Sequence, residues 1–434
     1  MTSAPNLKTG LRAADRTSAA DRSAWAARYR AVRQQSLSLA HPLSAEDQTI
    51  QSMPDASPTK WHLAHTTWFF ETFILTPHSV GYEAFDASFA YLFNSYYEAE
   101  GPRHPRAERG MLSRPSLENV RRYRAHADEA MLRFIEEASP AAWTAASPLI
   151  ELGFNHEEQH QELMLMDAKH LLSRNPLRPA YARRVPHEAH AASPLEWKSF
   201  GGGLFEIGHD GAGFAFDNEG PRHKVWLEPF RLACRLSTVG EYLSFIEEGG
   251  YERPEFWLSD GWATAQAEGW TAPLYWRRED GDWRIFTLHG ERPLNSVEPV
   301  SHVSYYEADA FARWAGKRLS TEAEWEVASR AAPQDGHFAD AGAYHPRPAA
   351  DPARLGQMFG DLWEWTQSPY TPYPRFKPAA GAVGEYNGKF MVNQFVLRGG
   401  ACVTPAGHAR ASYRNFFQPA ARWAFSGIRL ADDD

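Results

Sequence analysis

Apolar residues recur at a spacing near 3.6 in PLIELGFNHEEQHQELMLMDAKHLLS, residues 148–173, and predict a long helix. The middle of this stretch, NHEEQHQE at 155–162, carries two histidines, three glutamates and two glutamines. A helix that only fills a core does not need so many polar side chains. The stretch therefore predicts a helical domain that carries a functional site.

Three other segments have the same periodicity, at 23–40, 57–75 and 116–138. Helix N-caps are expected at Ser57, Ser116 and Ser147, because each precedes a helical segment and two of them precede a proline. Four long helices within residues 22–175 predict an antiparallel four-helix bundle.

The pattern changes after the bundle. Residues 176–195 are rich in Pro, Arg and His and are expected to form a linker, whereas 196–434 show short strands, glycines and scattered tryptophans. Strand–turn–strand units are expected at 201–211 and 216–233, and 303–330 is expected to form helix interrupted at Gly316. Residues 1–21 are expected to be a disordered tail. The fold class is therefore α+β, with a helical domain followed by a β-rich one.

Composition excludes several classes of function. The net charge of −9 argues against a nucleic-acid or anionic-membrane partner. With only Cys234 and Cys402, the chain has neither a disulfide framework nor a thiolate metal cage, as expected for a cytoplasmic protein. No apolar run reaches the roughly 18 residues of a membrane-spanning helix, and the N-terminus lacks the apolar middle of a signal peptide. Small-molecule partners are expected.

His156 and His160 predict a metal site. Four residues apart on a helix, they share one face and can place two imidazoles on one divalent ion. Glu162 lies about 120° and 160° around the helix from the two histidines, so it is expected to form hydrogen bonds elsewhere. Gln159 lies about 60° from His156, where it can contact a metal-bound water or a substrate.

A third ligand must come from another helix. The segment WHLAHTTWFFE offers His62 and His65, three residues apart on a strongly apolar helix where an unpartnered imidazole would be costly. Either histidine can complete a set of three. Three histidines bind zinc, or iron(II) with positions open for substrate and oxygen, and the residue types do not choose between these metals.

Two other segments offer candidate binding residues. The loop at 93–115 contains Tyr96 and Tyr97, which suit proton donation, followed by four basic residues whose arginines suit recognition of a carboxylate: Arg103, His104, Arg106 and Arg109. Near the C-terminus, Asn415, Phe416 and Phe417 can hold a cationic or imidazole-bearing ligand. The alternatives are a solvated basic loop and an ordinary aromatic core, and Trp363 and Trp365 are assigned to structure.

These motifs together resemble a known family. The segments SPTKWHLAHTTWFFETF, YLFNSYYEA, GPRHPR and LSRP, the histidine pattern of 156–162 and the C-terminal YRNFF and GIRLA are similar to the bacterial sulfoxide synthases of ergothioneine biosynthesis (hercynine oxygenases). Selenoneine synthases belong to the same superfamily. The resemblance runs from about residue 25 to 431. It implies a DinB-like four-helix bundle followed by a domain like the formylglycine-generating enzyme, with a C-type-lectin-like fold.

The resemblance also implies a set of site residues. Fe(2+) is expected on His65, His156 and His160, with His62 as a neighbour, and Gln159 is expected to contact the imidazole of hercynine. The carboxylate and trimethylammonium groups of hercynine are expected at Asn415, Phe416 and Phe417. The catalytic tyrosines near the iron are expected to be Tyr96 and Tyr97, and the carboxylate of the donor is expected at Arg103 and Arg106. The implied reaction uses O2 to form a bond from carbon to sulfur or selenium at imidazole C2.

The chalcogen donor is the open question. Glu100, Gln418 and Ala420 differ from what sulfur-using relatives are expected to carry, and an added carboxylate would discourage an acidic donor. This favours a selenosugar donor and selenoneine synthesis, with a sulfoxide synthase using cysteine or γ-glutamylcysteine as the alternative. More distant hypotheses are a DinB-like zinc hydrolase or thiol transferase, and a lectin-like binding module with structural histidines. The oligomeric state is not predicted.

Overall fold

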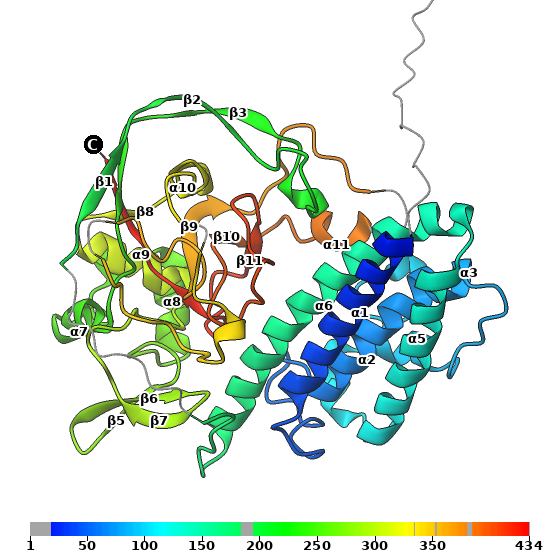
Figure 1. The fold of residues 1–434 in the computed structure, drawn as a ribbon. Helices are drawn as coiled ribbons and strands as arrows, with labels where there is room; N and C mark the ends of the chain where they lie inside the picture. The colour runs from blue at the N-terminus through cyan, green and yellow to red at the C-terminus, as the bar shows by residue number, and fades with distance from the viewer. Residues whose placement is uncertain (1–18, 184–193, 334, 352–353, 380–383, 434) are drawn as a thin grey trace, which may run out of the picture.

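The computed structural model describes residues 19–183, 194–333, 335–351, 354–379 and 384–433. Its N-terminal part is a bundle of four long helices (Figure 1): α1 (Ala19–Ala40), α2 (Thr59–Phe70), α5 (Leu117–Glu137) and α6 (Pro140–Arg174). The π-helical turn η1 (Glu71–Leu75) and the short α3 (Thr76–His78) extend α2. The predicted four-helix bundle is confirmed.

The connection between α2 and α5 is long and mostly irregular. It contains α4 (Phe89–Phe93) and two short 3-10 helices, η2 (Glu98–Glu100) and η3 (Arg106–Met111). The tyrosines and arginines singled out in the sequence therefore lie on a loop that runs across the bundle, rather than on its long helices.

One of the three predicted N-caps is confirmed. The Ser116 side chain accepts a hydrogen bond from the backbone N–H of Asn119 at the start of α5. The cap at Ser57 was wrong, because α2 begins after Pro58 and the Ser57 hydroxyl accepts from Arg109 instead. The cap at Ser147 was also wrong, because α6 begins at Pro140 with Ser139 as its cap.

The extra N-terminal turns of α6 are stabilised by packing. Trp143 meets Trp25 of α1 edge to face at 5.3 Å between ring centroids, and the Arg22 guanidinium lies 4.4 Å from the Trp143 ring. These contacts offset the backbone hydrogen bond that Pro148 cannot donate inside the helix.

Two predicted segments lie partly outside the described residues. Of the expected tail at 1–21, residues 1–18 are outside, whereas α1 already begins at Ala19. Of the expected linker at 176–195, residues 184–193 are outside. Before them, Tyr181 donates from its hydroxyl to the Leu39 carbonyl of α1 and from its backbone N–H to the Leu288 carbonyl of the β-rich domain, at 2.6 and 2.8 Å. This part of the connection therefore bridges the two domains.

Among the described residues, the C-terminal domain contains four small sheets. The first has the strand order β1 (Trp197–Phe200), β4 (Phe230–Ala233), β13 (Leu430–Asp433) and β8 (Arg318–Leu319). The second has the order β11 (Asn415–Phe417), β10 (Phe395–Arg398), β9 (Trp363–Pro369) and β12 (Ser426–Gly427). The others are the pair β2 (Gly203–Ile207) and β3 (His223–Leu227), and the meander β5 (Trp276–Glu279), β6 (Asp282–Thr287) and β7 (Gly290–Pro293).

The described part of this domain also contains the helices α7 (Val239–Glu247), α8 (Ser259–Ala267), α9 (Tyr305–Trp314), α10 (Glu322–Ser329) and α11 (Glu385–Gly388). The predicted interruption at Gly316 is confirmed, because this glycine has a φ of 65° between α9 and α10. Capping boxes start α9 at Ser304 and α10 at Thr321.

The second sheet faces α6 of the bundle (Figure 1). Buried apolar residues of both domains form one continuous cluster, which includes Leu172 of α6 and Trp363 of β9. No helix in the described part of the chain is long and apolar enough to cross a membrane. The fold thus brings the histidine-bearing face of α6 to the edge of the β-rich domain.

Candidate metal centre and active-site cavity

Three histidines from two helices meet in the bundle. His65 of α2 faces His156 and His160 of α6, and one nitrogen of each ring lies within 4.8 Å of the corresponding nitrogens of the other two. His62 is outside this set. The helical spacing had left the third ligand open between His62 and His65, and the structure places His65 with the pair on α6.

Hydrogen bonds determine which ring nitrogens face the centre. The Nδ1 of His65 lies 2.6 Å from the Phe93 carbonyl oxygen and must donate to it, which leaves Nε2 as a bare lone pair. This Nε2 lies 3.2 Å from Nε2 of His156. Two nitrogen ligands on one zinc or iron ion are about 3.0–3.4 Å apart, given bonds of about 2.1 Å. The two rings are therefore spaced as ligands of a shared ion.

All three imidazoles are neutral at physiological pH. Burial lowers the pKa of His156 to about 4. Burial, together with the neighbouring histidines, also holds the pKa values of His65 and His160 well below their usual range. Neutral imidazole is the form that binds a metal. Three nitrogen donors with no carboxylate suit Zn2+ or Fe2+ and do not suit Mg2+ or Ca2+.

Aromatic rings hold the centre in place. The His65 ring stacks between Trp61 and Trp68, with ring centroids 4.5 and 5.5 Å away. Trp61 in turn lies under the Arg109 guanidinium, whose central carbon is 3.4 Å from the centroid of the Trp61 ring. The rotamer of His65 is therefore set by packing, a property expected of a preorganised site.

The glutamates of NHEEQHQE point away from the centre, as the helical geometry predicts. Glu157 forms buried ion pairs with Arg33 and Arg124 inside the bundle. Glu162 accepts hydrogen bonds from the Trp363 indole and the Thr404 hydroxyl of the β-rich domain. The expectation that Glu162 forms hydrogen bonds elsewhere is confirmed, and its partners show that it connects the two domains.

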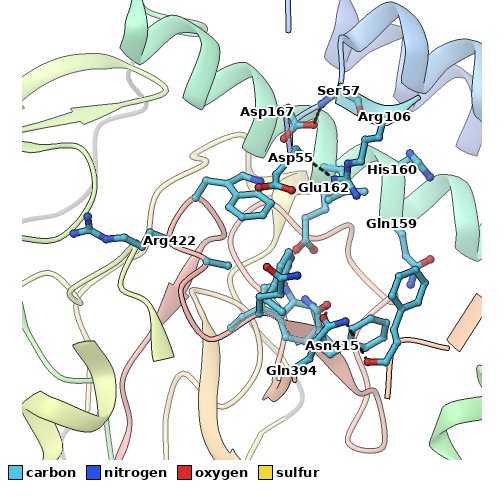
Figure 2. A pocket seen from close by; sticks show the side chains of 18 of the residues that line it. Asp55, Ser57, Arg106, Gln159, His160, Glu162, Asp167, Gln394, Asn415 and Arg422 are labelled. Atoms are coloured by element: carbon cyan, nitrogen blue, oxygen red, sulfur yellow. Dashed lines mark hydrogen bonds between the residues drawn. The ribbon is translucent and has the colours of Figure 1, made fainter. Parts of the chain in front are cut away.

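A cavity of about 700 Å³ lies beside the histidines, between the bundle and the β-rich domain (Figure 2). Asp55 and Arg106 enter it from the bundle side, and Gln394 and Asn415 enter it from the β-rich domain. His156, His160 and Gln159 form part of its wall. A site of this size can hold two small molecules next to a metal.

The C-terminal candidates all line this cavity. Asn415, Phe416 and Phe417 form β11, and the Phe416 ring stacks on Tyr370 with centroids 4.0 Å apart. Tyr413 also lines the cavity, and its hydroxyl accepts a hydrogen bond of 2.6 Å from the Gln159 side chain. Sequence reasoning missed Tyr413. The available signal was its place in the segment ASYRNFF, two residues from Asn415, although Tyr413 precedes β11 and no strand alternation selects it.

The loop at 93–115 contributes only some of its predicted residues. Tyr96 and Arg106 line the cavity, and Arg106 donates to the Tyr96 hydroxyl and the Asp55 carbonyl. Tyr97 is not part of the cavity wall and packs on Trp68 and Phe73 inside the bundle.

Arg103 also lies outside the cavity wall, where it pairs with Glu98 and donates to the Ser95 carbonyl. Glu100 is exposed and outside it too, whereas Gln418 and Ala420 line the cavity. Only part of the expected donor-binding set is therefore brought together.

Arg109 lies in the cavity wall, where Arg103 had been expected. It is 4% exposed, lines the cavity and donates to the Ser57 hydroxyl at 2.9 Å. Burial and the nearby Arg106 lower the pKa of Arg109 to about 9, which leaves the side chain charged at pH 7. Within the described residues, no carboxylate lies within ion-pair distance of Arg106 or Arg109. This wall of the cavity therefore favours an anionic ligand group.

Comparisons with known proteins cover both domains. Residues 28–172 match the DinB superfamily, and residues 185–357 and 341–434 match the sulfatase-modifying factor enzyme 1-like domain. The hercynine oxygenase of Mycolicibacterium thermoresistibile is 34% identical over 410 residues, which cover 88% of each chain.

Two further relatives show how far the similarity extends. The hercynine oxygenase of Mycobacterium tuberculosis is 34% identical over 406 residues, which cover 88% of this chain and 92% of its own. A formylglycine-generating enzyme of Streptomyces coelicolor is 29% identical over 272 residues, which cover 51% of this chain and 81% of its own. The first two relatives match across both domains, whereas the third matches about half of the chain.

Proposed function

Because this chain belongs to the hercynine oxygenase family, we propose that it is an iron(II)- and oxygen-dependent enzyme that joins a chalcogen donor to imidazole C2 of hercynine. The observation that carries the proposal is the buried triad of His65, His156 and His160 beside a two-domain cavity. When bound there, Fe2+ would activate O2 and lower the pKa of a donor thiol.

The part of the cavity wall that the β-rich domain forms is proposed to bind hercynine. Phe416 and Phe417 offer aromatic faces to the trimethylammonium group, and Asn415 offers an amide to the carboxylate. Tyr413 accepts a hydrogen bond from Gln159 and keeps its own hydroxyl hydrogen for an imidazole nitrogen of the substrate. Burial raises the pKa of Tyr413, so the hydroxyl remains protonated and can donate.

The bundle wall is proposed to bind the donor. Arg106 and Arg109 have no carboxylate partner in the described structure, so a donor carboxylate can form charge-assisted hydrogen bonds with both. Tyr96 adjoins Arg106 and is the proposed proton donor during oxygen reduction. Binding both substrates in one enclosed site supplies proximity and orientation.

The donor that this wall favours is a cysteine-type thiol. The sequence-based preference for a selenosugar depended partly on Glu100 lying in the donor pocket, and Glu100 is exposed outside the cavity wall. A neutral sugar would also leave the Arg106 and Arg109 guanidinium groups without an anionic partner. We therefore place the sulfoxide synthase first and retain selenoneine synthesis as the second candidate, on the observation that Gln418 and Ala420 do line the cavity.

The proposed reaction balances as one thiol, one hercynine and one O2 giving one sulfoxide and one water. The thiol hydrogen and the C2 hydrogen leave in the water, and the second oxygen atom remains on sulfur. A panel of cysteine, γ-glutamylcysteine and a selenosugar, each with hercynine, Fe2+ and O2, distinguishes the donors by product mass. We expect a sulfoxide of hercynine with a cysteine-type donor, whereas turnover with the selenosugar alone would overturn the sulfur assignment.

The same experiment tests the zinc alternative. A zinc hydrolase or thiol transferase would hold zinc at full occupancy and would take up no O2 with these substrates. We expect iron-dependent O2 uptake that requires both hercynine and the donor. Zinc-supported turnover without O2 uptake would overturn the proposed function.

A further inference from the structure

A hydrogen-bonded chain of three buried side chains leads to one of the candidate metal ligands. Asp167 Oδ2 lies 3.0 Å from Nε2 of His62, and Nδ1 of His62 lies 2.8 Å from Nδ1 of His160. The exposed fractions of Asp167, His62 and His160 are 7%, 2% and 9%. Only His160 has a role in the proposed function, so the other two side chains still require an explanation.

Asp167 determines which nitrogen donates and which accepts in this series of hydrogen bonds. An ionised Asp167 can only accept, so Nε2 of His62 carries the proton and donates it. A neutral His62 then has a bare Nδ1, which must accept from the Nδ1–H of His160. The Nε2 of His160 is consequently left with a lone pair, which is the state that a metal ligand needs.

We propose that Asp167 and His62 are positioning residues for the metal centre, which set the tautomer and ring orientation of His160 and strengthen it as a ligand. This inference rests on the proposed metal site. A carboxylate that acts on a metal through an imidazole raises the basicity of that ligand. Here a second imidazole lies between the carboxylate and the ligand, so the charge of Asp167 acts through two rings.

His160 is distinguished from the other two ligands by this connection. His65 donates to a neutral backbone carbonyl, and Nδ1 of His156 has no hydrogen-bond partner in the described part of the chain. Asp167 is itself held by the backbone N–H of Ser57 at 2.8 Å, just before α2 begins. The negative charge is thus anchored at a fixed point and reaches one ligand of the three.

The test is anaerobic Fe2+ binding to the full-length protein, measured by competition with a chromophoric chelator. Asp167→Asn retains the side-chain volume and an oxygen acceptor and removes the charge. His62→Phe removes both hydrogen bonds between Asp167 and His160 but retains a buried ring. We expect Fe2+ affinity to fall by about 10- to 100-fold in each variant. The absorption spectrum of the Co2+-substituted protein should also shift, and a purely packing role would not produce this change.

Glu151→Gln is the matched control on the same helix, because it also removes one carboxylate charge, but Glu151 pairs with Arg28 on the outside of the bundle and does not line the cavity. We expect its Fe2+ affinity and Co2+ spectrum to equal those of the wild type. If the wild type binds no Fe2+, both the proposed function and this inference fail. If the wild type binds Fe2+ and Asp167→Asn binds it equally well with the same Co2+ spectrum, only the positioning role is overturned. Asp167→Asn decides the question even if His62→Phe does not fold.

Discussion

Burial makes the Arg109 guanidinium a candidate for binding an anionic ligand. Its guanidinium stacks on Trp61, and its only side-chain hydrogen-bond acceptor in the described structure is the Ser57 hydroxyl. A buried cation without a carboxylate carries a desolvation cost that an anionic ligand can offset. The same residue therefore supports the ring that stacks on His65 and offers charge to the cavity.

Replacing Arg109 by Gln should weaken donor binding and leave hercynine binding unchanged. A hydrogen bond to a charged group is worth about 1.5–3 kcal/mol, which corresponds to a rise of about 10- to 100-fold in the KM for the thiol donor. Arg103→Gln is the control, because Arg103 lies outside the cavity wall and pairs with Glu98. Steady-state kinetics with each substrate varied in turn would measure this. Equal effects of the two substitutions on the donor KM would contradict the assignment.

Substitutions of the two adjacent tyrosines, Tyr96 and Tyr97, should also have different effects on catalysis. Tyr96→Phe removes a hydroxyl from the cavity wall and should lower kcat by about 100-fold if it delivers a proton. Tyr97→Phe changes a ring that packs among Trp68 and Phe73 and should alter thermal stability with little effect on kcat. A larger loss of kcat in Tyr97→Phe than in Tyr96→Phe would reverse these roles.

Periodicity explains which site residues could be predicted from the sequence. The four-residue spacing of His156 and His160 has one geometric meaning on a helix, and the apolar surroundings of His62 and His65 restrict the third ligand to two positions. Arg103, Arg106 and Arg109 are spaced three apart along a loop and a short 3-10 helix, where no long-range period selects one face. Only the packing of the loop against α2 shows that Arg109 faces the cavity and Arg103 does not.

Among the helices, α6 contributes side chains to the bundle core, to the candidate metal centre and to the boundary between the domains. One turn of this helix carries Glu157, whose ion pairs fix it to the bundle, and His160, which faces the candidate metal centre. Burial alone would raise the pKa of Glu157, but the Arg124 and Arg33 guanidinium groups outweigh this effect and lower the pKa to about 2.

Glu157→Gln should therefore destabilise the bundle at neutral pH. Removing one partner of a buried ion pair costs about 3–5 kcal/mol of unfolding free energy. Because the folded-state pKa is depressed, the contribution of Glu157 is fully present above its unfolded pKa near 4.5 and declines as the pH falls toward 2. Denaturant unfolding at pH 7 and pH 3 would measure this. A difference between variant and wild type that does not shrink at pH 3 would contradict the assignment.

The start of α6 was harder to predict than its middle. Ser147 before Pro148 has the residue types of a helix start, but contacts of Trp143 with α1 continue the helix to Ser139. Long-range packing outweighs a local signal here, and no pattern within the segment itself contains that information.

At the scale of the whole molecule, the cavity exists only where the two domains meet. Glu162 accepts hydrogen bonds from Trp363 and Thr404 across this boundary, and Lys169 Nζ of α6 lies 2.6 Å from Nε2 of His302. The order of the two domains and the change in residue pattern between them could be read from the sequence. Their relative placement could not, because it depends on these single contacts between distant segments.

Lys169, at the domain interface, should make the unfolding free energy depend on pH. Burial lowers the pKa of Lys169 to about 7, so the folded protein loses this proton well before the unfolded chain does. The penalty for burying the charge is fully present below pH 7 and declines as the pH rises toward the ordinary lysine pKa near 10.5. In Lys169→Met this dependence should be absent, so the difference in unfolding free energy should shift in favour of the wild type between pH 7 and pH 10. Parallel pH profiles for the two proteins would contradict this.

We propose that this chain forms a bond at imidazole C2 of hercynine with an ion held by His65, His156 and His160. The direct measurement is the mass of the product made from hercynine that carries deuterium at C2, with Fe2+, O2 and a cysteine-type donor. We expect every product molecule to have lost that deuterium and gained the donor sulfur and one oxygen atom, with no product from His160→Ala. A product that retains the C2 deuterium, or full turnover by His160→Ala, would contradict the claim.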